Sequence, residues 1–194
     1  MSISTGSLRA TVFPRSTALT HVGFIVAGTL FIAALAQIAI PVPGSPVPVT
    51  GQTLGVLLLA TSYGATLGTT TFFTYLLVGA LGAPVFANGG SGIERIVGAT
   101  GGYLVGMLLT SALLGYLGGR RWDQKFKTAL PAMLIGNVLT FGFGLLWLHQ
   151  YTGKDWAWTI SAGFTPFIIG EILKIAIAGT SLPLIWQFVQ RKIS

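Results

Sequence analysis

Charged residues and cysteine are scarce in this chain. Only 8% of its 194 residues are charged, against about 25% in an ordinary soluble domain. A soluble protein of this size needs a polar surface, which a chain with 52% hydrophobic residues does not provide. The absence of cysteine excludes disulfide bonds, thiolate metal sites and thiol nucleophiles. The composition therefore predicts a polytopic membrane protein.

Motifs for catalysis are missing as well. No Gly-x-x-x-x-Gly-Lys-[Ser/Thr] sequence occurs, so the chain has no P-loop for ATP hydrolysis. Its two histidines, His21 and His149, have no second ligand at metal spacing. Asp123 and Asp155 fall in separate loops and cannot form a paired-carboxylate site. We therefore expect the chain not to be an enzyme and to bind neither a metal nor another cofactor.

Apolar runs separated by proline, glycine and charge define the expected helices. A spanning helix needs about 20 apolar residues, so the length allows about six or seven spans. The expected helices cover residues 19–40, 52–62, 65–81, 96–117, 128–149 and 165–189. Thr165 is the expected N-cap of the last helix, with Pro166 at its first position. The proline-rich stretch 41–48 is expected to be a loop or re-entrant segment, and 82–94 and 150–159 are expected to be loops.

The basic residues are distributed unevenly between the two sides of such a bundle. With six helices, the side that holds both termini carries Arg9, Arg15, Arg120, Arg121, Lys125, Lys127, Arg191 and Lys192. The other side carries Arg95 and Lys154. The positive-inside rule then places both termini in the cytoplasm, which explains the net charge of +7 better than nucleic-acid binding does. The expected fold is an all-α, six-helix, single membrane domain, with a bundle over residues 19–189 and cytoplasmic tails at 1–18 and 190–194.

Glu171 and Lys174 are the sharpest polar feature of the predicted spans. They are three residues apart and therefore on one face of the last helix, less than two turns from its outer end. Ionisable groups at membrane depth are costly, so they normally pair, face the protein interior and mark a binding or transport pathway. A carboxylate beside an ammonium suits a small ligand that presents N–H and C=O groups together. A purely structural ion pair between helices is the alternative.

Asn88 and Arg95 flank the glycine-rich run before the fourth predicted helix and are further candidates for ligand contact. A guanidinium donates two parallel hydrogen bonds to a carboxylate, so we expect Arg95 to hold an acidic group of the ligand. Pairing with Glu94, or a place at the lipid headgroups, is the alternative for Arg95.

One enzyme class matches a short stretch of the same run. The sequence Gly89-Gly90-Ser91-Gly92 fits the Gly-x-Ser-Gly pattern of rhomboid intramembrane proteases. A nucleophilic serine needs a base within hydrogen-bond reach, and the last helix, where these proteases have theirs, contains no histidine. Ser91 is therefore better interpreted as a loop residue.

Four ordered motifs point to a transporter family. They are PVPGSPVPVTGQT at 41–53, GAPVFA at 82–87, GATGGYL at 98–104 and GEILK at 170–174. Over about residues 20–190 the chain resembles the BioY family, the biotin-binding S components of energy-coupling-factor transporters. The resemblance implies a six-helix protein that captures biotin from outside a bacterial cytoplasmic membrane. It also implies a transmembrane coupling subunit and two ATP-hydrolysing subunits as partners, which would supply the energy.

The resemblance also implies which residues bind the ligand. They are Glu171, Lys174, Asn88, Tyr103 and Gln52. Glu171, which stands where the family often has aspartate, and Lys174 would contact the ureido ring of biotin. Arg95 is no general feature of the family, so its expected role rests on the residues alone. A proton-coupled secondary transporter that uses Glu171 is the alternative function.

Overall fold

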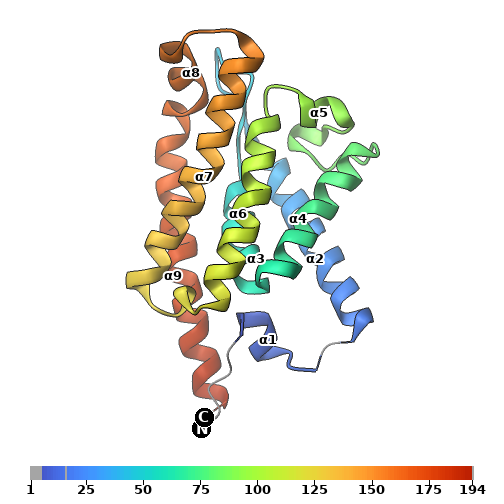
Figure 1. Cartoon of the computed structure of the whole chain (residues 1–194), viewed down its shortest axis with the longest axis vertical. Coiled ribbons are helices and arrows are strands. Elements are labelled where there is room, and N and C mark those ends of the chain that lie inside the picture. The colour runs from blue at the N-terminus through green and yellow to red at the C-terminus, as the bar shows by residue number, and fades with distance from the viewer. Residues whose placement is uncertain (1–5, 16, 194) are drawn as a thin grey trace.

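Helices make up most of this protein (Figure 1). The structure, a computed structural model, describes residues 6–15 and 17–193. Its α-helices are α1 (Leu8–Val12), α2 (Ala18–Gln37), α3 (Gln52–Tyr63), α4 (Ala65–Ala80), α5 (Ile93–Val97), α6 (Gly101–Gly119), α7 (Phe126–Thr152), α8 (Trp156–Gly163) and α9 (Ile168–Ile193). Three 3₁₀ turns join them, η1 (Ala87–Gly89), η2 (Trp122–Gln124) and η3 (Thr165–Phe167). Each of the six segments predicted to be helical overlaps one of the helices α2, α3, α4, α6, α7 and α9.

Helix α6 lies at the centre of the bundle and packs against α3, α4 and α7. Glycines on α6 let these neighbours approach closely, as small residues do between membrane helices. A Cβ at Gly106 would lie 2.7 Å from the Thr140 carbonyl oxygen on α7. One turn further on, the Thr110 hydroxyl donates to the Gly136 carbonyl at 2.8 Å. Helix α9 packs against α7 and α3, and α2 packs against α4 and α3.

Four segments are long and apolar enough to cross a membrane. They are Ala18–Gln37, Gly101–Gly119, Phe126–Thr152 and Trp156–Lys192, the last of which combines α8, η3 and α9. Helix α4 is apolar but has 16 residues, and α3 has 12. At 1.5 Å per residue, α3 is about 18 Å long, whereas the hydrocarbon core is about 30 Å thick. Length and composition thus identify four of the six predicted spans.

A two-stranded hairpin interrupts the all-α fold that we expected. Strands β1 (Ala39–Ile40) and β2 (Val49–Thr50) pair antiparallel and bracket the proline-rich stretch 41–48. The prediction that the first helix continues to residue 40 was wrong, because α2 ends at Gln37. The Gln37 side chain donates to the Phe86 carbonyl at 3.1 Å and accepts from the Gly89 amide at 2.9 Å. The end of α2 is therefore fixed by a distant loop.

The predicted fourth helix, 96–117, is two helices with a break at Gly98. Helix α5 ends at Val97, Gly98 has extended backbone, and α6 begins at Gly101. The Trp147 indole on α7 donates to the Gly98 carbonyl at 2.9 Å, which satisfies a group that a continuous helix would have bonded internally. This tertiary contact stabilises the break.

The predicted polar loop 150–159 contains the start of a further helix. Helix α7 continues to Thr152, and α8 begins at Trp156. The carboxylate of Asp155 caps α8 by accepting from the Trp158 amide at 2.7 Å. Thr165 is not the N-cap that we predicted, because its hydroxyl donates to the Ile160 carbonyl at 3.2 Å. Pro166 does lie in a first turn, that of η3, and the last helix runs to Ile193 rather than to residue 189.

The two ends of the molecule differ in what they carry. Figure 1 shows α1, the turn between α6 and α7, and the C-terminal end of α9 at one end. The hairpin, α5 and α8 lie at the opposite end. The basic clusters at 120–127 and 191–192 belong to the first end, and Arg95 and Lys154 belong to the second.

Candidate functional site

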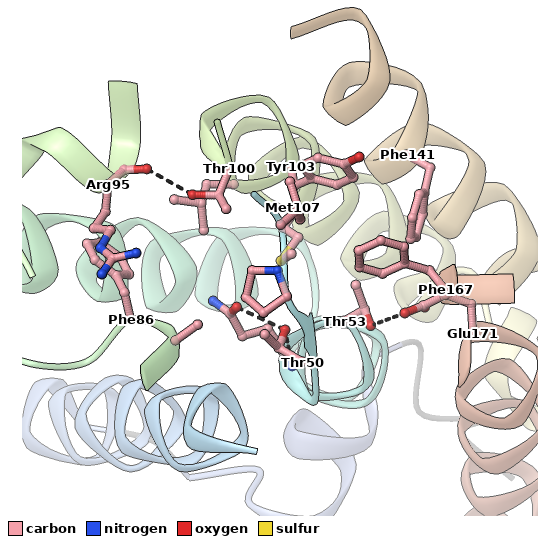
Figure 2. A pocket seen from close by; sticks show the side chains of 15 residues that line it. Thr50, Thr53, Phe86, Arg95, Thr100, Tyr103, Met107, Phe141, Phe167 and Glu171 are labelled. Carbon is pink, nitrogen blue, oxygen red and sulfur yellow. Dashed lines mark hydrogen bonds between the residues drawn. The ribbon is translucent and has the colours of Figure 1, made fainter. Parts of the chain in front are cut away.

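A pocket opens between the hairpin, α5, α6, α7 and the start of α9 (Figure 2). The empty space within it, counted to include the open mouth, is about 620 Å³. The residues that line it are Val47, Pro48, Thr50, Gln52, Thr53, Phe86, Ala87, Arg95, Thr100, Tyr103, Leu104, Met107, Phe141, Phe167 and Glu171. Most of this lining is apolar or aromatic, and the charged groups are Arg95 and Glu171.

The aromatic side of the pocket is a packed cluster on α6, α7 and η3. The Tyr103 ring meets Phe141 edge to face at 5.6 Å and stacks on Phe167 at 6.4 Å between centroids. The Tyr103 hydroxyl donates to the Gly163 carbonyl at 2.7 Å, which ties α6 to the end of α8. Tyr103 therefore lines the pocket as an aromatic wall whose hydroxyl already has a partner.

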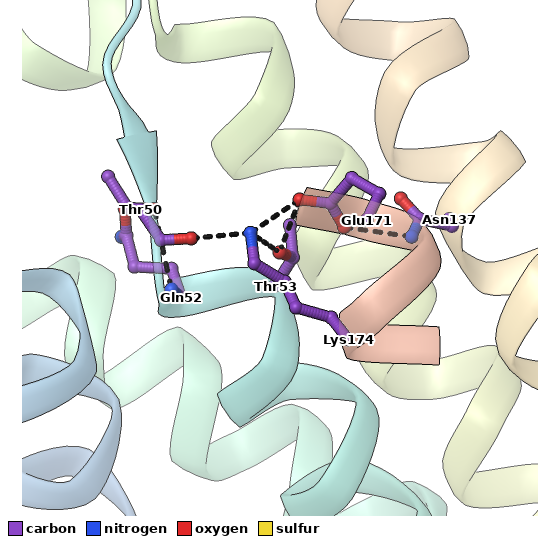
Figure 3. Close-up of polar contacts among 6 residues, drawn as sticks. All are labelled: Thr50, Gln52, Thr53, Asn137, Glu171 and Lys174. Carbon is purple, nitrogen blue, oxygen red and sulfur yellow. Dashed lines mark hydrogen bonds and ion pairs between the residues drawn. The ribbon is translucent and has the colours of Figure 1, made fainter. Parts of the chain in front are cut away.

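Glu171 and Lys174 form a buried ion pair at the polar side of the pocket (Figure 3). Lys174 Nζ lies 2.5 Å from Glu171 Oε1, and Glu171 is only 7% exposed. The spacing of three residues on α9 had predicted this shared face. Glu171 lines the pocket, whereas Lys174 lies just behind it, outside the set of lining residues.

Three further groups complete the network around this pair. Lys174 Nζ donates to the Thr50 carbonyl at 2.6 Å and to Thr53 Oγ1 at 3.0 Å. The Thr53 hydroxyl donates to Glu171 Oε1 at 2.9 Å. From the other side, Asn137 Nδ2 donates to Glu171 Oε2 at 2.8 Å. All three donors of the ammonium are therefore used, and α9 is joined to β2, α3 and α7.

Gln52 supports the pocket wall from beneath. Its amide donates to the Tyr75 hydroxyl at 2.7 Å and accepts from the Thr50 hydroxyl at 3.0 Å. The Tyr75 hydroxyl donates in turn to the Val85 carbonyl at 3.0 Å. Gln52 lines the pocket, and its hydrogen bonds connect β2, α4 and the loop after α4.

Arg95 lies across the pocket from Glu171, as Figure 2 shows. Its side chain passes over Gly90, where a Cβ would come within 2.7 Å of Arg95 Nε. Within residues 6–15 and 17–193, Glu171–Lys174 is the ion pair that the structure contains, so Arg95 is not paired with Glu94. Arg95 is one of the residues that line the pocket.

Asn88 is the candidate that the structure does not bring to the pocket. It is exposed, lies in η1, and is not a lining residue. Its backbone is left-handed, with φ of 57°, a conformation that asparagine adopts more readily than most residues. The turn that it forms positions the neighbouring Phe86 and Ala87, which do line the pocket.

Sequence reasoning missed Thr53 and Asn137. Thr53 lies within the 41–53 motif, but its partner is 118 positions away. Asn137 carried a signal that could have been used, because an amide in the middle of an apolar span is costly unless it is hydrogen-bonded. Among the residues described, no cluster of three or more His, Asp or Glu side chains could hold a metal ion.

Comparison with known proteins places this chain in a family. A family model described as the BioY family matches residues 9–191. The chain belongs to the BioY family. This BioY-family chain is 40% identical over 166 residues to the biotin transporter BioY2 of Lactococcus lactis subsp. cremoris, covering 82% of this chain and 86% of that one. It is 37% identical over 139 residues to the biotin transporter BioY of Thermotoga maritima, covering 72% and 80%.

A solved structure confirms the fold of this BioY-family chain. The crystal structure of the S-component for biotin from an ECF-type ABC transporter superposes with a TM-score of 0.80 at 22% identity. The match covers 89% of this chain and 95% of that chain. Membership in a transport family confirms the prediction of a multi-pass membrane protein that is not an enzyme.

Proposed function

We propose that this chain captures biotin and takes it up across the bacterial cytoplasmic membrane, as the substrate-binding component of an ATP-driven transporter. The observation that carries the proposal is the buried Glu171–Lys174 pair at the polar side of an apolar, aromatic pocket. Its relatives in Lactococcus lactis and Thermotoga maritima, both named biotin transporters, support the same ligand.

The chemistry of the pocket matches the parts of biotin. A ureido ring has two N–H donors and one carbonyl acceptor, which suit the Glu171 carboxylate and the Lys174 ammonium. The aromatic cluster provides apolar surface for the thiophane ring and the valeryl chain. Arg95, across the pocket, provides a forked donor for the carboxylate at the end of that chain. Tyr103 and Gln52 shape the walls, and Asn88 orders the turn at the entrance.

The proposed topology is a single membrane domain over residues 1–194, with a six-helix bundle at 19–189 and both termini in the cytoplasm. The basic end of the molecule supports this orientation, because Lys and Arg gather at cytoplasmic ends. The tails 1–18 and 190–194 would then lie inside, and the hairpin, α5 and α8 outside. The pocket would open toward the outside, where biotin is captured.

The energy for uptake would come from partners. The chain has no P-loop, and a binder that faces outward releases its ligand inside only if another state is favoured. We propose a transmembrane coupling subunit and two ATPase subunits of an energy-coupling-factor module as these partners. ATP would be used by them, and this chain would bind no cofactor.

Binding and transport measured separately test this function. The purified chain should bind biotin, and in proteoliposomes without the module it should not accumulate biotin against a gradient. Uphill uptake without an ATPase, driven by a proton gradient and lost in Glu171→Gln, would contradict the proposal and identify a proton-coupled transporter.

A matched pair of variants tests the expected role of Arg95. Arg95→Ala should weaken biotin binding about tenfold or more, because a hydrogen-bonded charge contributes roughly 1.5–3 kcal/mol. Glu94→Ala, on the same short helix but outside the pocket, should bind as the wild type does. Biotin methyl ester, in which the carboxylate is blocked, should bind the two variants with equal affinity. Unchanged biotin affinity in Arg95→Ala would remove this residue from the site.

A further inference from the structure

Asn137 lies on α7 beneath the pocket, one turn before the lining residue Phe141. It is 6% exposed, and its Nδ2 donates to Glu171 Oε2 at 2.8 Å (Figure 3). The reverse orientation of the amide would place two acceptors against each other, so the N–H must face the carboxylate. Its Oδ1 is buried and has no hydrogen-bond partner among the residues described. A buried amide oxygen without a hydrogen-bond partner lowers the stability of the fold, so packing alone does not explain an asparagine at this position.

The hydrogen bonds divide the two oxygens of Glu171 between different elements. Oε1 accepts from Lys174 and from Thr53, which belong to α9 and α3. Oε2 accepts from Asn137 on α7. A carboxylate has about four acceptor positions. Two donors on Oε1 and one on Oε2 leave one position, on Oε2, and Glu171 lines the pocket.

We propose that Asn137 is a positioning residue for ligand binding: it anchors Oε2 so that the carboxylate offers its remaining acceptor position to an N–H group of the ligand. Without this anchor, the carboxylate can rotate until both oxygens meet the Lys174 ammonium, which would occupy the edge that the ligand needs. The inference rests on the proposed function, because it assumes a ligand with an N–H donor, as the ureido ring of biotin has.

Contacts elsewhere already hold α7 against α9. A Cβ at Gly179 would lie 2.5 Å from Leu130 Cδ2, so the two helices touch closely there. Ala132 and Met133 on α7 pack with Ala178 and Leu182 on α9 in one buried cluster. The Asn137–Glu171 hydrogen bond is therefore not needed to join the helices, and its effect is expected at the carboxylate.

Asn137→Asp tests this role because it keeps the shape of the side chain and replaces the donor by a carboxyl group. Near pH 8 the two carboxylates should repel, so biotin binding should weaken by on the order of tenfold to a hundredfold. At a pH low enough to protonate the introduced carboxyl group, its O–H donates to Oε2 in place of the amide, so the affinity should return toward that of the wild type. Of the other charged or titratable groups described, Lys174 bonds Glu171 directly, and Arg95 and Tyr103 line the same pocket. They are unchanged in the variant, so the pH profile of the wild type is the reference.

Thr140→Val is the matched control for a structural effect. Thr140 is buried on the same helix, and its hydroxyl bonds that of Thr110 at 2.9 Å, away from the pocket. This variant should lower thermal stability and leave the biotin affinity and its pH profile unchanged. If Asn137→Asp binds as the wild type does, or loses the same affinity at every pH, the positioning role is overturned.

Ligand-free unfolding separates this inference from the proposed function. As the pH rises from 5 to 8, the unfolding midpoint of ligand-free Asn137→Asp should decrease relative to that of the wild type. In Asn137→Asp/Glu171→Gln this extra pH dependence should disappear, because the glutamine amide can donate to the new carboxylate. If the wild type binds no biotin, the proposed function fails. A midpoint of Asn137→Asp that follows the wild type at every pH would overturn the anchoring of Glu171 as well.

Discussion

The ammonium of Lys174 has three donors and uses them on the Thr50 carbonyl, the Thr53 hydroxyl and the Glu171 carboxylate. A ligand carbonyl that binds Lys174 must therefore replace one of these acceptors. The Thr50 carbonyl is the candidate for exchange, because it lies on β2 at the pocket. If the ligand takes this place, its binding would release the bond between Lys174 and the hairpin.

Thr53 is expected to hold the side chains of Lys174 and Glu171 in position relative to each other. Thr53→Val preserves the shape of the side chain but removes a donor to Glu171 and an acceptor from Lys174. Biotin binding, measured by calorimetry, should weaken about tenfold or more, since hydrogen bonds to charged groups contribute roughly 1.5–3 kcal/mol. Thr61→Val, also buried on α3 but bonded within its own helix, should bind normally. Equal affinity of both variants would exclude Thr53 from the site.

Asp123 is buried in η2, at the basic end of the molecule, and accepts a hydrogen bond from the Trp186 indole at 2.6 Å. Burial raises the pKa of its carboxyl from 3.8 to about 6, and the Trp186 bond opposes this in part. The folded protein therefore holds a proton that the unfolded chain releases at lower pH. The stability that this proton contributes is present below pH 4 and is lost as the pH rises through about 6.

Asp123→Asn should remove this pH dependence, because asparagine accepts the same indole bond and does not titrate. Between about pH 4 and pH 7, the wild type should lose on the order of 3 kcal/mol more stability than the variant. Unfolding midpoints in detergent across this range give the measurement. Parallel curves for the two proteins would show that Asp123 is not protonated in the folded state at low pH.

At the scale of elements, the loop after α4 is held by the contact between Gly79 and Phe86. A Cβ at Gly79 would overlap the Phe86 ring, and Phe86 lines the pocket. Gly79→Ala should therefore displace this ring, lower stability by about 1–3 kcal/mol and weaken biotin binding. Gly142→Ala, in open space on α7, should change stability by no more than about 1 kcal/mol and leave binding unchanged. Thermal unfolding and calorimetry of both variants make the comparison. A tolerated alanine at position 79 would contradict the close packing.

The helices were predictable from sequence, and several of their ends were not. Long apolar runs indicate helices because membrane spans need them. The end of α2 and the break at Gly98 depend on Gln37 and Trp147, which bond loops far away in the chain. Helix α8 had a sequence signal, because Gly153 ends α7 and Asp155 is the N-cap of α8. The polar composition of 150–159 led instead to the prediction of a loop.

Only the part of the site that lies on a single helix was predictable from sequence. A spacing of three residues places Glu171 and Lys174 on one face, and the structure confirms the pair. Thr53 and Asn137 reach Glu171 from α3 and α7. The periodicity of a sequence shows which residues share a face of one helix, but not which helices are neighbours in space. Whether these residues bind biotin remains a prediction until binding is measured.

We propose that the whole molecule binds its ligand without chemical change. The polar network and the apolar pocket would hold the ligand in one state, and release would require partners that favour another. Chemistry on the ligand is not needed for uptake, and the BioY family to which the chain belongs is a family of transporters.

The central claim is that biotin binds at the Glu171–Lys174 pair. Thermal unfolding of the detergent-purified wild type, Glu171→Gln and Lys174→Ala, each with and without biotin, tests it most directly. Biotin at about 100 times its Kd should stabilise the wild type by about 2.7 kcal/mol and raise its unfolding midpoint. We expect this rise to be lost in both variants. No rise in folded wild-type protein, or the same rise in all three proteins, would contradict it.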